Sequence, residues 1–245
     1  MSQGQHVTTD GPRLIRIENR QDIAEGLCAN GIAVGSRVLV CVGGASGLGE
    51  EHAAALTGAF HDLVAPAVDA WSAVVVDGGT DAGVMRMIGR ARASAGAGFP
   101  LIGVAAIGTV RLPDAPASDE DATPLEPNHT HVVLVPGTKW GDETPWLAAV
   151  AGVIAGDRPS VTVVVNGGTI TLSDAEASLA AGRPVIVLAG SGRTADDIAR
   201  ARAGEQAGER ARAIAASPLT SIVDAGDPRG IVEGIAAALA GDRRQ

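Results

Sequence analysis

Aromatic residues are scarce in this 245-residue sequence, which contains three Trp, two Phe and no Tyr. The core must therefore be built from Ala, Val, Ile and Leu, as suits helices packed closely on a sheet. Basic residues are outnumbered by acidic ones: the net charge is −9 and Lys139 is the sole lysine. An acidic chain without a basic stripe is not expected to bind nucleic acid or an anionic membrane surface.

Cysteines and long apolar stretches are also lacking. Cys28 and Cys41 have neither the spacing of a zinc site nor that of a disulfide framework, and a reduced, packed thiol is expected at Cys41. No apolar stretch reaches the ~20 residues that span a bilayer, so membrane insertion is not expected. Residues 1–12 are polar and read as a disordered lead-in rather than a signal peptide, so a cytoplasmic location is expected.

What the chain does contain is four strand-like apolar runs, each followed by a glycine cluster. They are residues 38–42 before Gly43-Gly44, 73–76 before Gly78-Gly79-Thr80, 161–165 before Gly167-Gly168-Thr169, and 184–189 before Gly190-Ser191-Gly192-Arg193. Buried parallel strands read as continuous β-branched runs. Glycine at their carboxyl ends lets backbone N–H groups approach a ligand closely, so several such loops at one sheet edge favour an anion-binding crevice.

Strand-like and helical segments alternate along the chain, which predicts an α/β fold with a doubly wound, mainly parallel sheet of about six to seven strands flanked by helices. The other expected strands are residues 101–106, 131–135 and 220–223, with 14–17 at an edge. No linker divides the chain, so residues 13–245 are interpreted as one domain.

Three further segments carry local signals. Residues 50–64 have helical spacing, and the capping box from Ser173 to Glu176 predicts a helix that starts there and reaches Ala181. Residues 112–128 are rich in Pro, Asp and Ser and are expected to form a surface loop or flap.

The glycine loops give the candidate ligand contacts. These are Gly43, Gly44, Ala45, Gly78, Gly79, Thr80, Gly167, Gly168, Thr169, Gly190, Ser191, Gly192 and Arg193. Arg193 stands out because a guanidinium before a helix start binds phosphate bidentately or stacks on a base. Ordinary turn chemistry, helix capping by Ser191 and Thr169, and a solvated Arg193 are the competing explanations.

Other side chains suit catalysis or metal binding less clearly. His129-Thr130-His131 places two imidazoles two residues apart, but no third ligand has metal spacing, so no metal is predicted and a structural or loop-anchoring role is favoured. Glu143 is a candidate general base or ribose acceptor, with complementing a helix dipole as the alternative. Asp77 could orient the glycine pair that follows it or contact a ribose. No paired-carboxylate pattern stands out.

Taken together, these segments resemble the SLOG domain of melastatin-type transient receptor potential (TRPM) channels and its stand-alone prokaryotic relatives. The most specific matches are His129-Thr130-His131 and the segment Gly190-Ser191-Gly192-Arg193-Thr194-Ala195-Asp196. The resemblance covers residues 37–199. It is carried by residues 43–44, 77–84, 102–105, 128–135, 141–143, 166–169 and 190–196.

The resemblance implies a Rossmann-like fold and a cytosolic sensor domain that binds an NAD-derived nucleotide such as ADP-ribose, with no further cofactor. The small-molecule nucleotide is the expected partner, and a homo-oligomer is compatible with the sequence. The implied contacts are Gly43, Gly44, Gly167, Gly168, Thr169, Gly190, Ser191 and Arg193.

The alternative function is that of a nucleotide N-glycosidase. LOG enzymes of the same superfamily release a base from a nucleoside monophosphate and carry a Pro-Gly-Gly-x-Gly-Thr-x-x-Glu motif. Placed on residues 136–143, that motif lacks its second glycine and its Gly-Thr pair, and Glu143, the catalytic candidate, is displaced. A hydrolase of N-glycosyl bonds is therefore the less favoured prediction.

Overall fold

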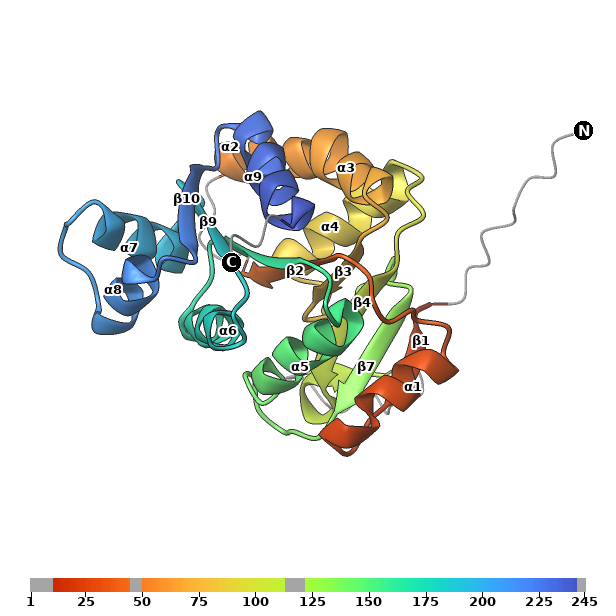
Figure 1. Cartoon of the computed structure of the whole chain (residues 1–245). Coiled ribbons are helices and arrows are strands. Elements are labelled where there is room, and N and C mark those ends of the chain that lie inside the picture. The colour runs from red at the N-terminus through yellow and green to blue at the C-terminus, as the bar shows by residue number, and fades with distance from the viewer. Residues whose placement is uncertain (1–10, 45–49, 113–121, 242–245) are drawn as a thin grey trace, which may run out of the picture.

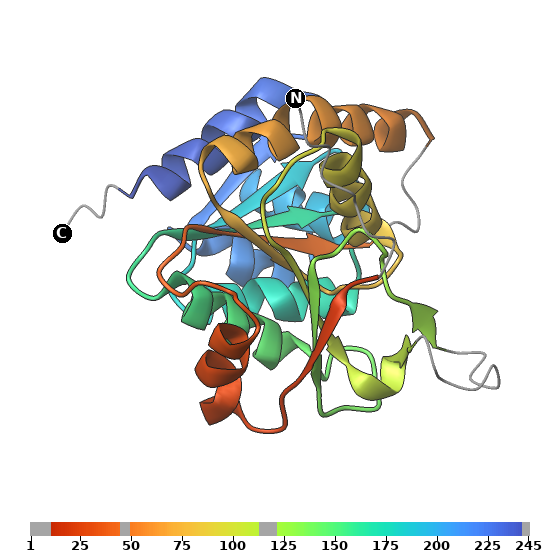
Figure 2. The same ribbon diagram turned by 90° about the vertical axis from the view of Figure 1, so that its right-hand side faces the viewer.

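The computed structural model of the chain describes residues 11–44, 50–112 and 122–241. Through this part of the chain runs a parallel sheet of eight strands in the order β1-β7-β4-β3-β2-β8-β9-β10 (Figures 1 and 2). The strands are β1 (Arg13–Arg16), β2 (Val38–Gly43), β3 (Val74–Asp77), β4 (Leu101–Ala106), β7 (His131–Val135), β8 (Ser160–Val165), β9 (Val185–Ala189) and β10 (Thr220–Asp224). The short strands β5 (Val110–Arg111) and β6 (Thr123–Pro124) form a separate parallel pair.

Helices cover both faces of the sheet (Figure 1). One face carries α2 (Glu50–Ala59), α3 (Ala65–Ala70), α4 (Gly83–Ser94) and α9 (Pro228–Ala240). The other carries α1 (Ile23–Ala29), α5 (Thr144–Ala155), α6 (Thr169–Ala180), α7 (Arg193–Arg202) and α8 (Glu209–Ala216). The predicted doubly wound α/β fold is confirmed.

Burial on both faces explains the unbroken apolar runs of the central strands. In β2, Val38 and Val40 pack against the helices of one face, whereas Leu39 and Cys41 pack against those of the other. All four side chains are fully buried. A polar residue at any of these positions would lack water on either side, so the period-two alternation of a half-exposed strand is absent.

The chain reverses its direction of winding between β2 and β8. Strands β3, β4 and β7 extend the sheet on one side of β2, and β8, β9 and β10 extend it on the other. The connecting loops diverge at such a reversal, and ligands bind in the crevice outside the strand ends there.

Two predicted helix boundaries are wrong. Helix α6 begins at Thr169 rather than Ser173, because Gly168 is extended and its N–H donates to Thr171 Oγ1 at 3.2 Å. Ser173 and Glu176, which were predicted to form a capping box, instead both accept hydrogen bonds from Arg210 of α8. The helix expected over residues 50–64 continues through a π-helical turn at Phe60–Val64 into α3.

Other outcomes concern the sheet and the flap. The sheet has one strand more than the upper prediction, because the edge strand β1 pairs with β7 over four residues.

Of the predicted flap, residues 113–121 lie outside the described residues, as do residues 1–10 of the predicted lead-in. The end of the flap segment is not loose: Glu126 is 1% exposed and Thr80 forms an antiparallel bridge with Leu125. Within the described ranges, no helix is both long and apolar enough to cross a bilayer.

Candidate ligand-binding site

A cavity of about 430 Å³ opens at the carboxyl ends of β2, β3, β4 and β8, at the point where the sheet reverses. Loops from distant parts of the chain form its wall. The predicted contacts that line it are Gly43, Gly44, Gly78, Thr80, Gly167, Gly168, Thr169 and Arg193. The glycine loops therefore converge on one hollow.

The first loop requires glycine for a steric reason. Gly43 ends β2 with φ +149° and pairs with Val165 of β8. A Cβ atom at Gly43 would stand only 1.8 Å from the carbonyl oxygen of Val165. Only glycine lets the two backbones approach this closely, and Gly43 itself lines the cavity.

Hydrogen bonds hold the β8 and β9 loops together. Asn166, at φ +54°, has its N–H bonded to Ser191 Oγ at 2.8 Å, and the Asn166 carbonyl accepts from Ala195 N at 3.1 Å. Ser191 Oγ in turn donates to the carbonyl of Leu188 at 2.6 Å. A non-glycine residue held in the left-handed region costs roughly 1–3 kcal/mol, and such residues cluster at ligand sites.

Arg193 brings the positive charge of the site. It is the first residue of α7, also in the left-handed region at φ +48°, and it is exposed. Its guanidinium reaches across Gly168 at the start of α6, where a Cβ atom would lie 3.3 Å from Arg193 Nη2. Among the described residues that line the cavity, Arg193 is the only one with a cationic side chain.

Several predicted contacts lie elsewhere. Gly79, Gly190, Ser191 and Gly192 do not line the cavity, and Ala45 lies outside the described residues. The Gly190 N–H is bonded to Asp196 Oδ1 at 2.7 Å. Gly190, Ser191 and Gly192 thus belong to the loop that leads from β9 to Arg193, outside the cavity lining.

A short loop between β7 and α5 presents Trp140 to the cavity. Asp142 Oδ2 accepts hydrogen bonds from the N–H groups of Thr138 (2.9 Å) and Lys139 (3.0 Å), which fixes the loop. These bonds hold the pKa of the exposed Asp142 carboxyl below its usual range. Trp140 lines the cavity with 47% of its surface exposed. An exposed indole in a chain so poor in aromatics offers a flat apolar surface to a ligand.

Two buried carboxyl groups, Glu143 and Asp174, line the same cavity. Glu143 Oε2 accepts from Gly141 N at 2.9 Å, and Thr144 Oγ1 donates to Asp174 Oδ1 at 2.6 Å. Burial raises the pKa of Glu143. Burial, together with the nearby charge of Glu143, raises the pKa of Asp174 to about 7, although the Thr144 hydrogen bond opposes this. The structure thus brings together two carboxyl groups that no paired-carboxylate pattern in the sequence indicates.

Asp174 is the site residue that the sequence analysis missed. The Pro-Gly-Gly-x-Gly-Thr-x-x-Glu motif fits residues 166–174 better than residues 136–143. There Gly167, Gly168 and Thr171 match the motif, Asp174 replaces its glutamate, and Asn166 and Ile170 depart from it. The spacing from the glycine pair to Asp174 could have revealed the site.

His129 and His131 do not act together. His131 is half-buried, and its Nδ1 lies 3.0 Å from Thr130 Oγ1. Burial lowers the pKa of His131, with Arg13 adding to the effect. His129 instead points into a buried cluster with Asp77 and Glu126, away from the cavity. Among the described residues, no group of three or more His, Cys, Asp and Glu side chains is placed to hold a metal ion.

The fold and the cavity define a Rossmann-like α/β protein with a hollow at the switch point of its sheet. Residues 36–232 match the family model described as "SLOG in TRPM, prokaryote". The chain therefore belongs to this family, which confirms the resemblance inferred from the sequence.

Two known proteins place the family in context. Over 175 residues the chain is 32% identical to transient receptor potential cation channel subfamily M member 2 of Rattus norvegicus. That match covers 57% of this chain and 11% of the channel protein, so the chain corresponds to a small part of that relative. The fold is also similar to that of the molybdenum cofactor carrier protein of Chlamydomonas reinhardtii, with TM-score 0.55 and 14% identity, covering 84% of this chain and 99% of the carrier.

Proposed function

We propose that this protein is a cytosolic sensor that binds an NAD-derived nucleotide, with ADP-ribose as the sharpest candidate, in the cavity at the switch point. The observation that carries the proposal is the placement of Arg193 across the start of α6, in one cavity with the glycine loops. A diphosphate would accept hydrogen bonds from the N–H groups at a helix start and from the guanidinium.

Trp140 supports a ligand with a planar ring. Its indole lies at the cavity while the phosphate-binding elements come from β8 and α6. Stacking of a base on an aromatic side chain contributes about 1–3 kcal/mol. A nucleotide would meet Arg193 and Trp140 together, whereas a simple phosphate would meet Arg193 alone.

Calorimetric titration with ADP-ribose, NAD and AMP tests the proposal. We expect saturable binding of ADP-ribose and at least a tenfold loss of affinity in Arg193→Gln. Arg212→Gln is the matched control, since Arg212 is exposed on α8 and does not line the cavity. No heat with any of the three nucleotides, or equal losses in the two variants, would refute the proposal.

A second candidate function rests on the carboxyl pair. Asp174 has a pKa of about 7 beside Glu143, and a carboxyl group poised near neutrality suits general acid–base catalysis. The reaction would be hydrolysis of an N-glycosyl bond: Asp174 or Glu143 takes a proton from water, the water oxygen bonds to the anomeric carbon, and the base leaves with the bonding electrons.

Product analysis separates the two functions. Incubation with NAD or a nucleoside monophosphate, followed by chromatography, would show free base only if the chain is a hydrolase. Asp174→Asn would then abolish release while retaining ligand binding. If wild-type protein binds ADP-ribose and releases no base from these nucleotides, the catalytic function is excluded for them.

A further inference from the structure

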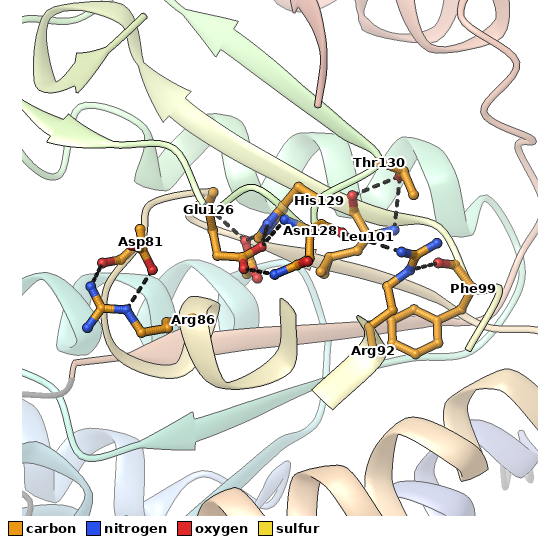
Figure 3. Close-up of polar contacts among 11 residues, drawn as sticks. Asp81, Arg86, Arg92, Phe99, Leu101, Glu126, Asn128, His129 and Thr130 are labelled. Carbon is orange, nitrogen blue, oxygen red and sulfur yellow. Dashed lines mark hydrogen bonds and ion pairs between the residues drawn. The ribbon is translucent and has the colours of Figure 1, made fainter. Parts of the chain in front are cut away.

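A buried cluster outside the cavity joins His129 to the carboxylates of Asp77 and Glu126. Figure 3 shows His129 beside Glu126. His129 Nε2 lies 2.7 Å from Asp77 Oδ1, and His129 Nδ1 lies 2.8 Å from Glu126 Oε2. The exposed fractions of the His129, Asp77 and Glu126 side chains are 0%, 0% and 1%. Each ring nitrogen faces a carboxylate oxygen, an arrangement that suits an imidazolium ring with hydrogen on both nitrogens.

His, Asp and Glu are residue types that occur together in catalytic sites, but a substrate cannot reach this cluster. No side chain of the three lines the cavity, and all three are sealed from solvent. A general base must reach its substrate directly or through one water. The role of the cluster must therefore be sought in what it connects.

The cluster fastens the end of the flap segment to the cavity wall. Asp77 Oδ1 accepts from Gly79 N at 2.7 Å as well as from His129, and the Gly79 carbonyl accepts from Glu126 N at 3.0 Å. Next to these bonds, Thr80 bridges Leu125 in antiparallel fashion. Since Gly78 and Thr80 line the cavity, the cluster braces the turn that forms part of its wall.

Helix α4 leaves room for the Glu126 carboxylate. A Cβ atom at Gly89 would stand 2.2 Å from Glu126 Oε2, so a larger residue would expel the carboxylate. The N–H and side-chain amide of Asn128 also donate to Glu126, at 2.9 and 2.5 Å. Asp77 is less well satisfied: its Oδ2 is buried with no hydrogen-bond partner among the described residues. His129 and the Gly79 N–H both contact the other carboxylate oxygen, Oδ1.

We propose that His129 is a positioning residue for the ligand cavity: as a cation between Asp77 and Glu126, it holds Gly78 and Thr80 in the conformation that binds ligand. The proposal rests on the nucleotide-binding function proposed above. It assigns to the His-Thr-His segment a role that requires no contact between His129 and the ligand.

The surrounding charges agree with a protonated ring. Burial would lower the pKa of His129, but the hydrogen bonds and charges of Asp77 and Glu126 outweigh it and raise the pKa to about 9. The other charged groups nearby are Arg92 of α4, which donates to the Asn128 carbonyl at 3.4 Å, and the Asp81–Arg86 ion pair (Figure 3). On β2, the Cys41 thiol has its pKa raised by burial and by Asp77, so it stays neutral.

Amide hydrogen exchange without ligand tests the bracing, and calorimetry with ADP-ribose tests its consequence. In His129→Gln we expect exchange at Gly79 and Glu126 to rise at least tenfold and ADP-ribose affinity to fall at least tenfold. His61→Gln is the matched control, because the partly exposed His61 places Nδ1 2.5 Å from Asp62 Oδ1 and does not line the cavity. It should change neither quantity.

Wild-type protein provides a second test that does not depend on folding of the variant. Two-bond ¹⁵N–¹H spectra should show both nitrogens of His129 protonated at pH 7.5, and a neutral ring would overturn the proposal. Unchanged exchange in His129→Gln, or faster exchange with unchanged affinity, would also overturn it. Failure of wild-type protein to bind ADP-ribose would instead refute the proposed function, so the two failures are distinguishable.

Discussion

The His129 cluster makes folding stability depend on pH in the alkaline range. The pKa of His129 is about 9 in the folded protein and 6.5 without its partners. A group whose pKa rises on folding stabilises the fold fully below its unfolded pKa and loses that contribution as pH rises through its folded pKa. From these two values, the His129 contribution to the free energy of unfolding falls by about 2 kcal/mol between pH 7 and pH 9.

The composition of the chain makes this loss measurable. There is no tyrosine and only one lysine to titrate in the same range. Cys41 has its pKa raised above 9.0 by burial, so its own contribution to stability is lost mainly above pH 9. Asp174, with a pKa of about 7, also titrates between pH 7 and pH 9, so its contribution is removed by comparing the wild type with a variant that keeps Asp174.

Urea unfolding at pH 7, 8 and 9 is the assay, and the quantity compared is the free energy of unfolding. Wild-type protein and His61→Gln should lose about 2 kcal/mol more than His129→Gln over this interval. The variant serves as the reference, because groups that titrate equally in both proteins cancel. If wild type and His129→Gln lose the same free energy, the ring is not held as a cation and the reasoning fails.

Three further substitutions probe the cavity. Gly43→Ala forces Cβ against the Val165 carbonyl, and we expect a loss of about 3 kcal/mol in urea unfolding; a loss below 1 kcal/mol would contradict the close approach. Gly168→Ala displaces the Arg193 guanidinium and should weaken ADP-ribose binding about three- to tenfold by calorimetry, at unchanged stability. Trp140→Leu should abolish most of the ligand-induced change in tryptophan fluorescence and reduce affinity about tenfold; an undiminished signal would exclude stacking there.

The convergence of the glycine loops was predictable because of a simple property of parallel sheets. Their strands all end at the same edge, so a glycine that follows Val42 and one that follows Val165 must be near neighbours if the strands are close. Strands β2 and β8 pair directly although they lie far apart in the sequence. The order of the strands depends on where each crossover connection packs on the sheet. The local sequence pattern does not encode this order.

The local sequence does not indicate the positions of Glu126 and Asp174, and the reason is the same for both. Glu126 lies in a segment whose composition indicates a surface loop, yet it is buried because Gly89 opens space and His129 supplies charge from elsewhere in the chain. Asp174 was read as part of a helix cap, but α6 starts four residues earlier, so the side chain belongs to the second turn and lines the cavity. In both cases, contacts with residues distant in the sequence determined where the polar side chain lies.

The charges of the cavity also restrict what the proposed ligand can be. Arg193 and the first turn of α6 suit an anionic group, whereas Glu143 and Asp174 suit hydrogen-bond donors and disfavour a second anion. A ligand that joins phosphate to a sugar rich in hydroxyl groups satisfies both parts. Inorganic phosphate satisfies only the first and brings no sugar hydroxyl group to the buried carboxyl groups. The polarity of the site thus argues for a nucleotide sugar of the ADP-ribose type over a simple phosphate, on grounds independent of the family match.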